Sequence, residues 1–408
     1  MSAAAGGMVR QAVFLVGGKG TRLGALTQAT PKPLLEIAPG VRFLDVVLEE
    51  AARKGFTDLL LLAGHLGEQV EAAYAGRSFG AARVRVLREP EPMGTGGALG
   101  FAAAALDPWF VMGNGDSLFD INLRALAAPG EGFDGRVALR EVPDPARYGA
   151  VRLEGARITA FLEKRADLPG PALINGGLYL LRREAALARI AGPCSIEADV
   201  FPALAAAGRL HGQRFEGYFL DMGLPDTYAQ ACAEIPARRV RPCAFLDRDG
   251  TLNRDEGYTH RVEDLEWLPG AVEAVRLLND AGYRVIVVTN QAGVARGHYR
   301  EADVQRFHAA MAQALAAHGA WIDAFHYCPH HPEAVLEHYR CADHPDRKPN
   351  PGMLLNAMRE HAINPAASFL VGDQDSDVAA ARAAGIEGVK ISSPGGLLDV
   401  VRARVANG

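Results

Sequence analysis

Short runs of apolar and β-branched residues alternate with segments of helical spacing along the first half of the chain. The strand-like runs are residues 11–16, 58–63, 84–87, 109–112 and 137–142. Apolar residues recur at helical spacing between them, at 43–54, 67–74 and 96–105. Because strands that alternate with helices usually pair in parallel, this pattern predicts an α/β domain with a doubly wound, mainly parallel sheet. Two close runs around Gly155, within 150–161, predict an inserted hairpin.

A second series of the same kind follows. Strand-like runs lie at 244–246, 285–288, 324–327 and 369–371, with helical patterns at 271–281, 303–318 and 352–361. The stretch EIPARRVRP at 234–242 has prolines and arginines but no periodicity. We therefore expect a short tail at 1–8, a first domain at 9–235, a linker at 236–242 and a second α/β, doubly wound domain at 243–408.

Composition and charge narrow the class of protein. The 408 residues are 49% hydrophobic and 22% charged, which is typical of a folded globular chain with two domains. A net charge of −5 argues against a general nucleic-acid or membrane-binding surface. No apolar run is long enough to span a bilayer, and the start MSAAAGGM lacks a signal-peptide core. Five scattered cysteines favour a reducing cytoplasm. Oligomeric state is left open, a homo-oligomer included.

The segment GGKGTRLG at 17–24 directly follows the first predicted strand. Its glycines allow the backbone to approach a ligand closely and to point N–H groups at phosphate oxygens. Lys19 and Arg22 add positive charge, and the guanidinium matches phosphate geometry. The spacing fits neither the P-loop nor the dinucleotide fingerprint, so alone it is weak evidence for a phosphate site.

Further motifs follow in a fixed order: PKPLLEI (31–37), GTGGALG (94–100), GNGDSLFDINL (113–123), FLEKR (161–165), INGGLYLL (174–181) and GYFLDMG (217–223). Together with the glycine-rich loop they resemble the sugar-1-phosphate nucleotidyltransferases, most of all the heptose-1-phosphate guanylyltransferases, which have a Rossmann-like fold. Val16 stands where that family usually has alanine, and we expect it to change packing rather than chemistry.

The resemblance implies that a sugar 1-phosphate attacks the α-phosphate of a nucleoside triphosphate. Asp116 and Asp221 would bind Mg²⁺, and Arg22 and Lys32 would be the catalytic cations. The implied substrate-binding residues are Gly17, Gly18, Gly20, Thr21, Gly97, Glu163, Lys164, Asn175 and Gly176. A purely structural role is the alternative for three of these residues: Asp116 could end a strand, Lys164 could be a solvated lysine and Asn175 could cap a turn. Asp120 and Asn122 are expected to be structural.

FLDRDGTLN at 245–253 opens the second series. Asp247 ends an apolar strand and Asp249 lies two residues further, so alternation along an extended chain would aim both carboxylates the same way. Phosphoryl transfer through a carboxylate needs one nucleophile and one acid, which are the roles expected for Asp247 and Asp249. Gly250 would permit the following turn.

Later segments complete a set of four motifs: VIVVTNQAGVARG (285–297), RKPNPGM (347–353) and FLVGDQDSDV (369–378). The set resembles the haloacid-dehalogenase phosphatases, and DEGYTHRVEDLEWLPG (255–270) resembles their histidinol-phosphate and heptose-bisphosphate branch. The resemblance implies phosphate binding by Thr289, Asn290, Arg347 and Lys348, and Mg²⁺ binding by Asp247, Asp249 and Asp373. Asp377 is expected either beside this site or as a helix N-terminal acid.

That branch often carries a zinc loop with Cys-x-His and a later Cys-x-Cys. Here Cys328 and His330 match, but CADHPD precedes Arg347 in place of Cys-x-Cys. Cys328, His330, Cys341 and His344 still form a chemically sound zinc set. The alternative is a loop that has lost its metal.

The two resemblances share one intermediate, because the product of the phosphatase would be the substrate of the nucleotidyltransferase. They imply a cytoplasmic bifunctional enzyme for a surface polysaccharide such as lipopolysaccharide, which removes the 7-phosphate of D-glycero-D-manno-heptose 1,7-bisphosphate and then joins heptose 1-phosphate to GTP. Neither nucleic acid nor membrane is an expected partner. Three alternatives remain: another sugar or nucleotide such as UTP, a nucleotide-sugar-sensing module, and a histidinol-phosphate phosphatase.

Overall fold

The computed structural model describes residues 8–128, 130–145, 150–162 and 170–406. The chain divides into two compact units, Met1–Pro236 and Ala237–Gly408. Helix α7 (Pro225–Arg238) contains Pro236, so the segment expected to be a linker begins inside a helix. Proline has no N–H to donate to the carbonyl four residues earlier, so Pro236 weakens the last turn of this helix.

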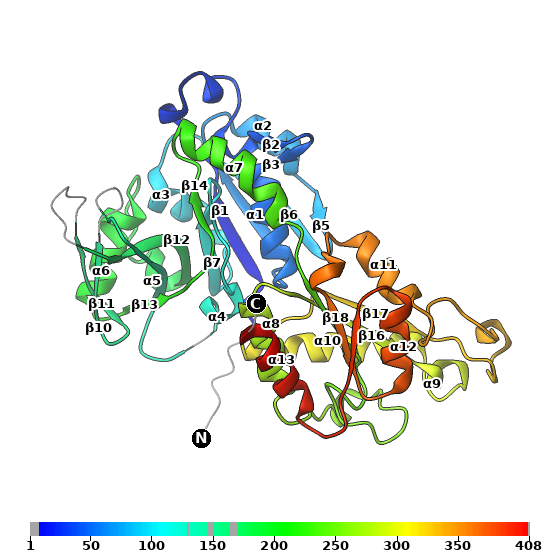
Figure 1. The fold of residues 1–408 in the computed structure, drawn as a ribbon. Helices are drawn as coiled ribbons and strands as arrows, with labels where there is room; N and C mark the ends of the chain where they lie inside the picture. Colours follow the sequence, from blue (N-terminus) through cyan, green and yellow to red (C-terminus); the bar gives the residue numbers. More distant parts are fainter. Residues whose placement is uncertain (1–7, 129, 146–149, 163–169, 407–408) are drawn as a thin grey trace. The chain divides into compact units, whose positions relative to one another are not determined.

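The first unit is built on a ten-stranded sheet of order β10-β11-β13-β9-β12-β7-β1-β4-β6-β5 (Figure 1). Its strands are β1 (Gln11–Leu15), β4 (Asp58–Ala63), β5 (Ser78–Phe79), β6 (Ala82–Arg88), β7 (Trp109–Asn114), β9 (Gly135–Val142), β10 (Ala150–Glu154), β11 (Arg157–Leu162), β12 (Ala172–Arg182) and β13 (Leu210–Arg214). Strands β7, β1, β4 and β6 are parallel, whereas β12 pairs antiparallel with both β7 and β9. The sheet is therefore mixed, and the expected hairpin is β10–β11.

Alternate residues of β1 face opposite layers. Ala12 and Phe14 pack with α1 (Phe43–Arg53), α2 (Gly67–Tyr74) and α7, while Val13 packs with α3 (Gly94–Phe101) and α6 (Phe201–Ala206). Helices thus cover both faces of the sheet, which is the expected doubly wound α/β arrangement.

The second unit has a five-stranded, fully parallel sheet of order β17-β16-β15-β18-β19. Its strands are β15 (Cys243–Leu246), β16 (Arg284–Asn290), β17 (Ala324–Cys328), β18 (Phe369–Gly372) and β19 (Glu387–Lys390). Helices α8 (Ala271–Asp280), α10 (Glu301–Ala317) and α13 (Gly396–Ala406) contribute to one core layer, and α11 (Gly352–Glu360) and α12 (Asp375–Ala383) to the other. The α/β class expected for this half is confirmed.

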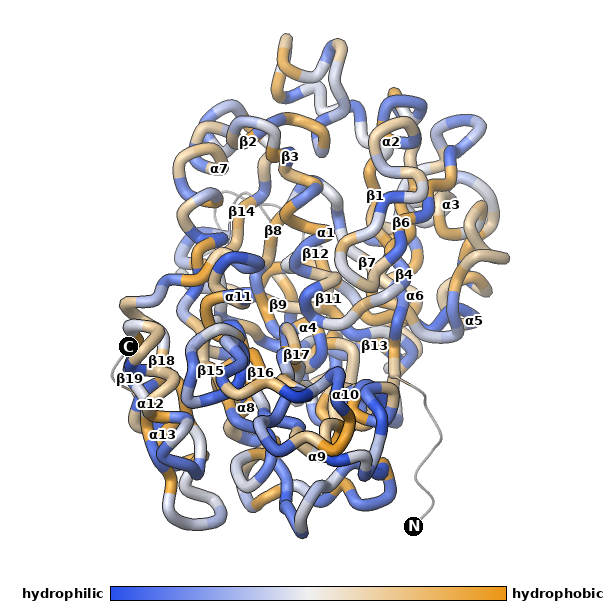
Figure 2. Tube along the Cα trace, turned by 90° about the vertical axis from the view of Figure 1, so that its right-hand side faces the viewer, coloured by the Kyte–Doolittle hydropathy of each residue, from blue (hydrophilic) through white to orange (hydrophobic). Residues whose placement is uncertain are grey.

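Orange apolar and blue polar stretches alternate along the trace in Figure 2, as expected for strands and helices that bury one side. Among the helices described, none combines the length and the apolar character that crossing a membrane would need.

Candidate active sites

The glycine-rich loop after β1 forms one wall of two cavities in the first unit. One cavity, of about 270 Å³, is lined by the predicted residues Gly18, Gly20, Thr21, Arg22, Lys32 and Asp116. The other, of about 360 Å³, shares Gly18 and Lys19 and adds Gly17. A Cβ at Gly17 would lie 2.7 Å from the amide nitrogen of Gly64, so only glycine fits there. Val16 is buried and would meet a Cβ at Gly115, which supports a packing role.

Lys32 forms ion pairs with both carboxylates that were predicted to bind Mg²⁺. Its Nζ lies 2.6 Å from Oδ2 of Asp116 and 3.6 Å from Oδ1 of Asp221, and its side chain is only 7% exposed. A short ribbon sets this distance, because β8 (Ser117–Phe119) pairs antiparallel with β14 (Phe219–Asp221). Asp221 thus lies opposite Ser117, next to Asp116. The three charged groups are brought together from widely separated parts of the chain.

The expected sugar-binding residues are placed less uniformly. Asn175 lies at a bulge of β12, where its Nδ2 donates to the Tyr179 hydroxyl at 3.0 Å and to Oε1 of Glu197 at 3.3 Å. Gly176 is adjacent and packs against Phe119. Glu163 and Lys164 lie outside the described residues. No sequence motif had indicated Glu197.

Gly97 lies on α3 and does not line either cavity. A Cβ there would meet Met93 and the backbone of Gly192 and Pro193, so this glycine allows a close helix–loop approach. Thr95 and Ala98 of the same helix line the larger cavity instead. Asn122 caps α4 (Leu123–Leu126) by accepting from the Ala125 N–H, as its structural role requires.

A cavity of about 460 Å³ lies at the carboxyl ends of β15, β16 and β18 in the second unit. It is lined by the predicted residues Asp247, Asp249, Thr289, Asn290, Lys348 and Asp373, and also by Asp255, Tyr258, Gln291, Tyr299 and Asp377. Carboxyl ends of parallel strands meet at one edge of a sheet, which explains why motifs far apart in sequence converge. Arg347 does not line this cavity, because its Nη1 donates to the His330 carbonyl at 3.1 Å.

Lys348 lies between two buried carboxylates. Its Nζ is 2.6 Å from Oδ1 of Asp247 and 2.6 Å from Oδ1 of Asp377. Asn290 contacts the backbone of the same lysine, because its Nδ2 donates to the Lys348 carbonyl at 3.0 Å. Burial raises the pKa of Asp247, Lys348 opposes this effect, and Asp377 and Asp249 add to it. A further positive charge at this cavity would therefore stabilise the ionised Asp247.

Both sequence expectations for Asp377 have a counterpart in the structure. Besides pairing with Lys348, its Oδ2 accepts from the Gln374 N–H at the start of α12. Gly250 has φ +78°, and a Cβ there would lie 2.6 Å from Oδ2 of Asp373. Only glycine permits both the turn and the approach of this carboxylate.

Asp249 is held by a group that the sequence did not reveal. The fully buried Arg248 donates from Nε to Oδ1 of Asp249 at 2.9 Å and from Nη2 to Oδ2 at 2.8 Å. Gln291 also donates to Oδ2, at 2.8 Å, and Tyr299 donates to Gln291. This network fixes the Asp249 carboxylate beside the cavity.

The expected zinc ligands are close to one another but are not assembled. Cys328 Sγ lies 3.7 Å from Nδ1 of His344, yet the rings of His330 and His344 stack face to face with centroids 4.0 Å apart. Nδ1 of His344 also accepts from the Asp346 N–H. Within the part of the chain that the structure describes, no three of Cys328, His330, Cys341 and His344 bring ligand atoms within 4.8 Å of one another. In the described residues the four side chains do not converge on one point, because ring stacking and the contacts of His330 with the Tyr339 carbonyl and of His344 with the Asp346 N–H set their directions.

Comparison with known proteins follows the same division. The family model described as nucleotidyl transferase matches residues 11–238, and a HAD-hydrolase-like model matches residues 346–394. The chain is 48% identical over 151 residues to the D-glycero-β-D-manno-heptose-1,7-bisphosphate 7-phosphatase of Rhodopseudomonas palustris, covering 37% of this chain and 83% of that protein. The protein of the same name from Escherichia coli is 43% identical over 154 residues, covering 37% and 78%.

Among solved structures, the chain is similar to HddC from Yersinia pseudotuberculosis complexed with GMP-PN. The TM-score is 0.50 and the identity 26%, and the match covers 56% of this chain and 100% of that chain.

Proposed function

This chain belongs to the nucleotidyl transferase family and to the family of the heptose-bisphosphate 7-phosphatases, and from that premise we propose that it makes a nucleotide-activated heptose in two consecutive reactions. The second unit removes the 7-phosphate of D-glycero-D-manno-heptose 1,7-bisphosphate, and the first unit joins the remaining 1-phosphate to a nucleotide. The observation that carries this proposal is that both families occur in one chain, because the product of one reaction is the substrate class of the other.

The phosphatase reaction is assigned to the cavity at Asp247. An Asp247 oxygen attacks the phosphorus and forms an O–P bond, while the sugar oxygen leaves and takes a proton from Asp249. Water then attacks the aspartyl phosphate, Asp249 accepts its proton, and inorganic phosphate leaves. Lys348 and Thr289 would bind phosphoryl oxygens, since both line the cavity.

A magnesium ion fits this cavity. Ligand oxygens of Asp247, Asp373 and Asp377 lie within 4.8 Å of one another, so Asp377 stands in this group in place of the expected Asp249. Oδ1 of Asp373 is buried without a hydrogen-bond partner in the described residues. Carboxylate oxygens are the ligands that Mg²⁺ prefers. When bound, the ion supplies positive charge that neutralises the phosphoryl group.

The transferase reaction is assigned to the cavity beside the glycine-rich loop. The sugar-phosphate oxygen attacks the α-phosphorus of the nucleoside triphosphate, and pyrophosphate leaves. Arg22 and Lys32 would hold the phosphates, and the backbone N–H groups of the loop would add contacts. Asp116 and Asp221 offer an oxygen-donor set suited to Mg²⁺, which would neutralise charge on the triphosphate when bound. Catalysis here consists of positioning and charge neutralisation.

GTP is the proposed nucleotide. The similarity to HddC complexed with GMP-PN supports a guanine nucleotide over UTP. All five cysteines are unpaired, which supports a reducing compartment, and we place the reactions in the cytoplasm.

Two variants test the assignment of one reaction to each unit. Asp247→Asn should stop phosphate release from heptose 1,7-bisphosphate but leave nucleotide transfer to supplied heptose 1-phosphate unchanged. Asp221→Asn should have the opposite effect. If either folded variant loses both reactions, the assignment of separate sites is wrong.

A further inference from the structure

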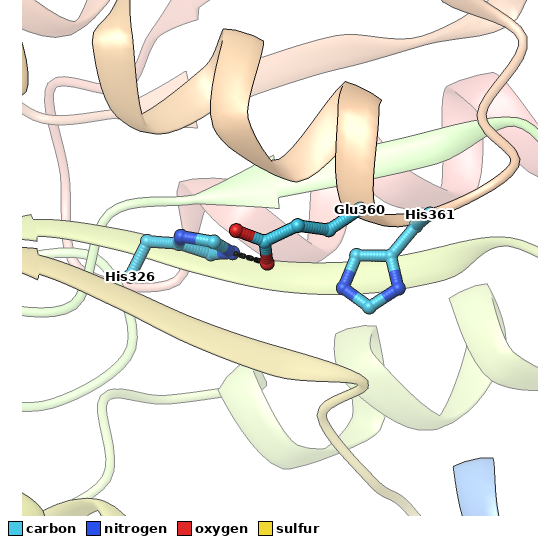
Figure 3. A group of neighbouring side chains, drawn as sticks. All are labelled: His326, Glu360 and His361. Carbon is cyan, nitrogen blue, oxygen red and sulfur yellow. Dashed lines mark ion pairs between the residues drawn. The ribbon is translucent and has the colours of Figure 1, made fainter. Parts of the chain in front are cut away.

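A group of side chains of the types that can bind metals lies in the second unit, apart from the residues that line its cavity at Asp247. It consists of His326 on the edge strand β17, and of Glu360 and His361 at the end of α11 (Figure 3). One possible ligand atom of each residue lies within 4.8 Å of those of the other two. None of the three takes part in the reactions proposed above.

The distance between His326 and Glu360 resembles that of two ligands around one ion rather than a hydrogen bond. Nε2 of His326 lies 3.6 Å from Oε2 of Glu360, which is too long for a good hydrogen bond. Two ligands that bind one tetrahedral zinc at bond lengths of about 2.1 Å lie roughly 3.4 Å apart. In Figure 3 the Glu360 carboxylate lies between the two imidazole rings. Small side-chain movements would bring all three to one centre.

His361 supplies the second observation. Its Nε2 is buried and has no hydrogen-bond partner among the described residues. Buried polar atoms are normally paired, so an unpaired ring nitrogen beside a carboxylate and a second imidazole indicates a missing partner.

The backbone holds these residues on regular elements, and the site is open to ions. His326 is in register with Val288 of β16, and the His361 N–H donates to the Ala357 carbonyl at 3.0 Å. The His326 side chain is 15% exposed and that of Glu360 is 59% exposed. An ion could therefore enter past Glu360 without unfolding the unit.

We propose that His326, Glu360 and His361 bind a divalent transition-metal ion of the zinc type, with water as a further ligand. Two imidazoles and one carboxylate are a known zinc donor set, whereas magnesium and calcium prefer oxygen ligands. The bound ion joins the edge strand β17 to the end of α11 and stabilises the second unit.

The test uses the full-length chain in buffer with excess Mg²⁺, titrated with Zn²⁺ and Co²⁺. The variants are His326→Ala, His361→Ala and Glu360→Gln, and His318→Ala is the control because His318 is an exposed histidine outside the group. Each histidine variant should bind one Zn²⁺ fewer per chain than the wild type and the control. Glu360→Gln, which removes an exposed carboxylate and should not perturb folding, should weaken binding by about tenfold or more.

Two further readouts separate this site from the loop at Cys328. Bound Co²⁺ should give visible absorption bands without a thiolate charge-transfer band, and Zn²⁺ at about 100 times its Kd should raise the Tm of the second unit by roughly 5–10 °C. The proposal is overturned if His361→Ala or Glu360→Gln binds Zn²⁺ like the wild type. It is also overturned if the only Co²⁺ absorption is a thiolate band, because the metal would then occupy the cysteine loop.

Discussion

The Nζ atom of Lys348 lies 2.6 Å from Oδ1 of Asp247 inside the second unit. The first unit repeats the arrangement with different residues, because Nζ of Lys32 lies 2.6 Å from Oδ2 of Asp116. In both sites one buried lysine also contacts a second carboxylate from another part of the chain, Asp377 or Asp221. Each lysine thus holds together acidic groups that would otherwise repel one another.

Replacing Lys348 with methionine should abolish most of the phosphatase activity. The variant leaves Asp247 and Asp377 buried without their cation, which should cost about 3–5 kcal/mol of stability and about 10²–10³-fold in phosphate release. Lys390→Met is the control, because Lys390 pairs with the exposed Asp375. Phosphate release and thermal unfolding are measured together. A folded Lys348→Met variant with normal phosphate release would contradict the role of this lysine.

Two neighbouring glycines of the first loop should respond differently to alanine. In Gly17→Ala the new Cβ meets the backbone of Gly64, so the loop must shift, which we expect to cost about 1–3 kcal/mol. In Gly18→Ala the Cβ meets no atom of the described residues within 4 Å, so stability should change little. Thermal unfolding of both variants tests this prediction, and Gly17→Ala should have the lower Tm. Equal values would mean that the close approach of Gly17 to Gly64 is not needed for the fold.

Arg248→Lys should slow the phosphatase reaction through Asp249. Lysine cannot make the paired contacts of the guanidinium with both carboxylate oxygens, and misplacing a catalytic group by about 1 Å can cost about 10²-fold in rate. Arg248 is a positioning residue, so kcat should fall while KM stays nearly constant. The exposed Arg254→Lys is the control. An unchanged kcat, or a change in KM alone, would argue against this role.

His308 should make the stability of the second unit depend on pH. Burial, together with the nearby Arg248, lowers its pKa from 6.5 to about 3. Below pH 6.5 the unfolded chain binds a proton that the folded chain does not, so stability is full above 6.5 and decreases as the pH falls toward 3. His308→Gln should reduce the slope of unfolding free energy against pH in this range by about 1.4 kcal/mol per unit. Urea denaturation at several pH values measures it, and parallel curves for wild type and variant would refute the assignment.

The parts that sequence predicted best are strands followed directly by motif residues. Asp116 and Asp247 were expected at strand ends, and the structure places them next to β7 and β15. Strand β12 was not expected, because Asn175, Gly176 and Gly177 interrupt its apolar pattern and glycine weakens strand propensity. The bulge at Asn175 explains how the strand continues through them.

Other features depend on contacts that a linear pattern does not contain. Arg248 is fully buried, although arginine rarely is, because Asp249, Thr259 and the Phe307 ring all contact it. Gly97 was expected at the nucleotide, but the backbone of Gly192 and Pro193 occupies the space beside it. The loop that contains Cys328, His330 and His344 is a further example. Its residue types predicted zinc ligands, but local hydrogen bonds, which the sequence does not reveal, set the directions of the side chains.

The coupling of two reactions in one chain is tested most directly by mass spectrometry of the products. The wild-type protein is given heptose 1,7-bisphosphate, Mg²⁺ and equal amounts of GTP, UTP, ATP and CTP. We predict inorganic phosphate, pyrophosphate and GDP-heptose, with no other nucleotide sugar in comparable amount. Release of inorganic phosphate without any nucleotide-linked heptose would contradict the proposed function.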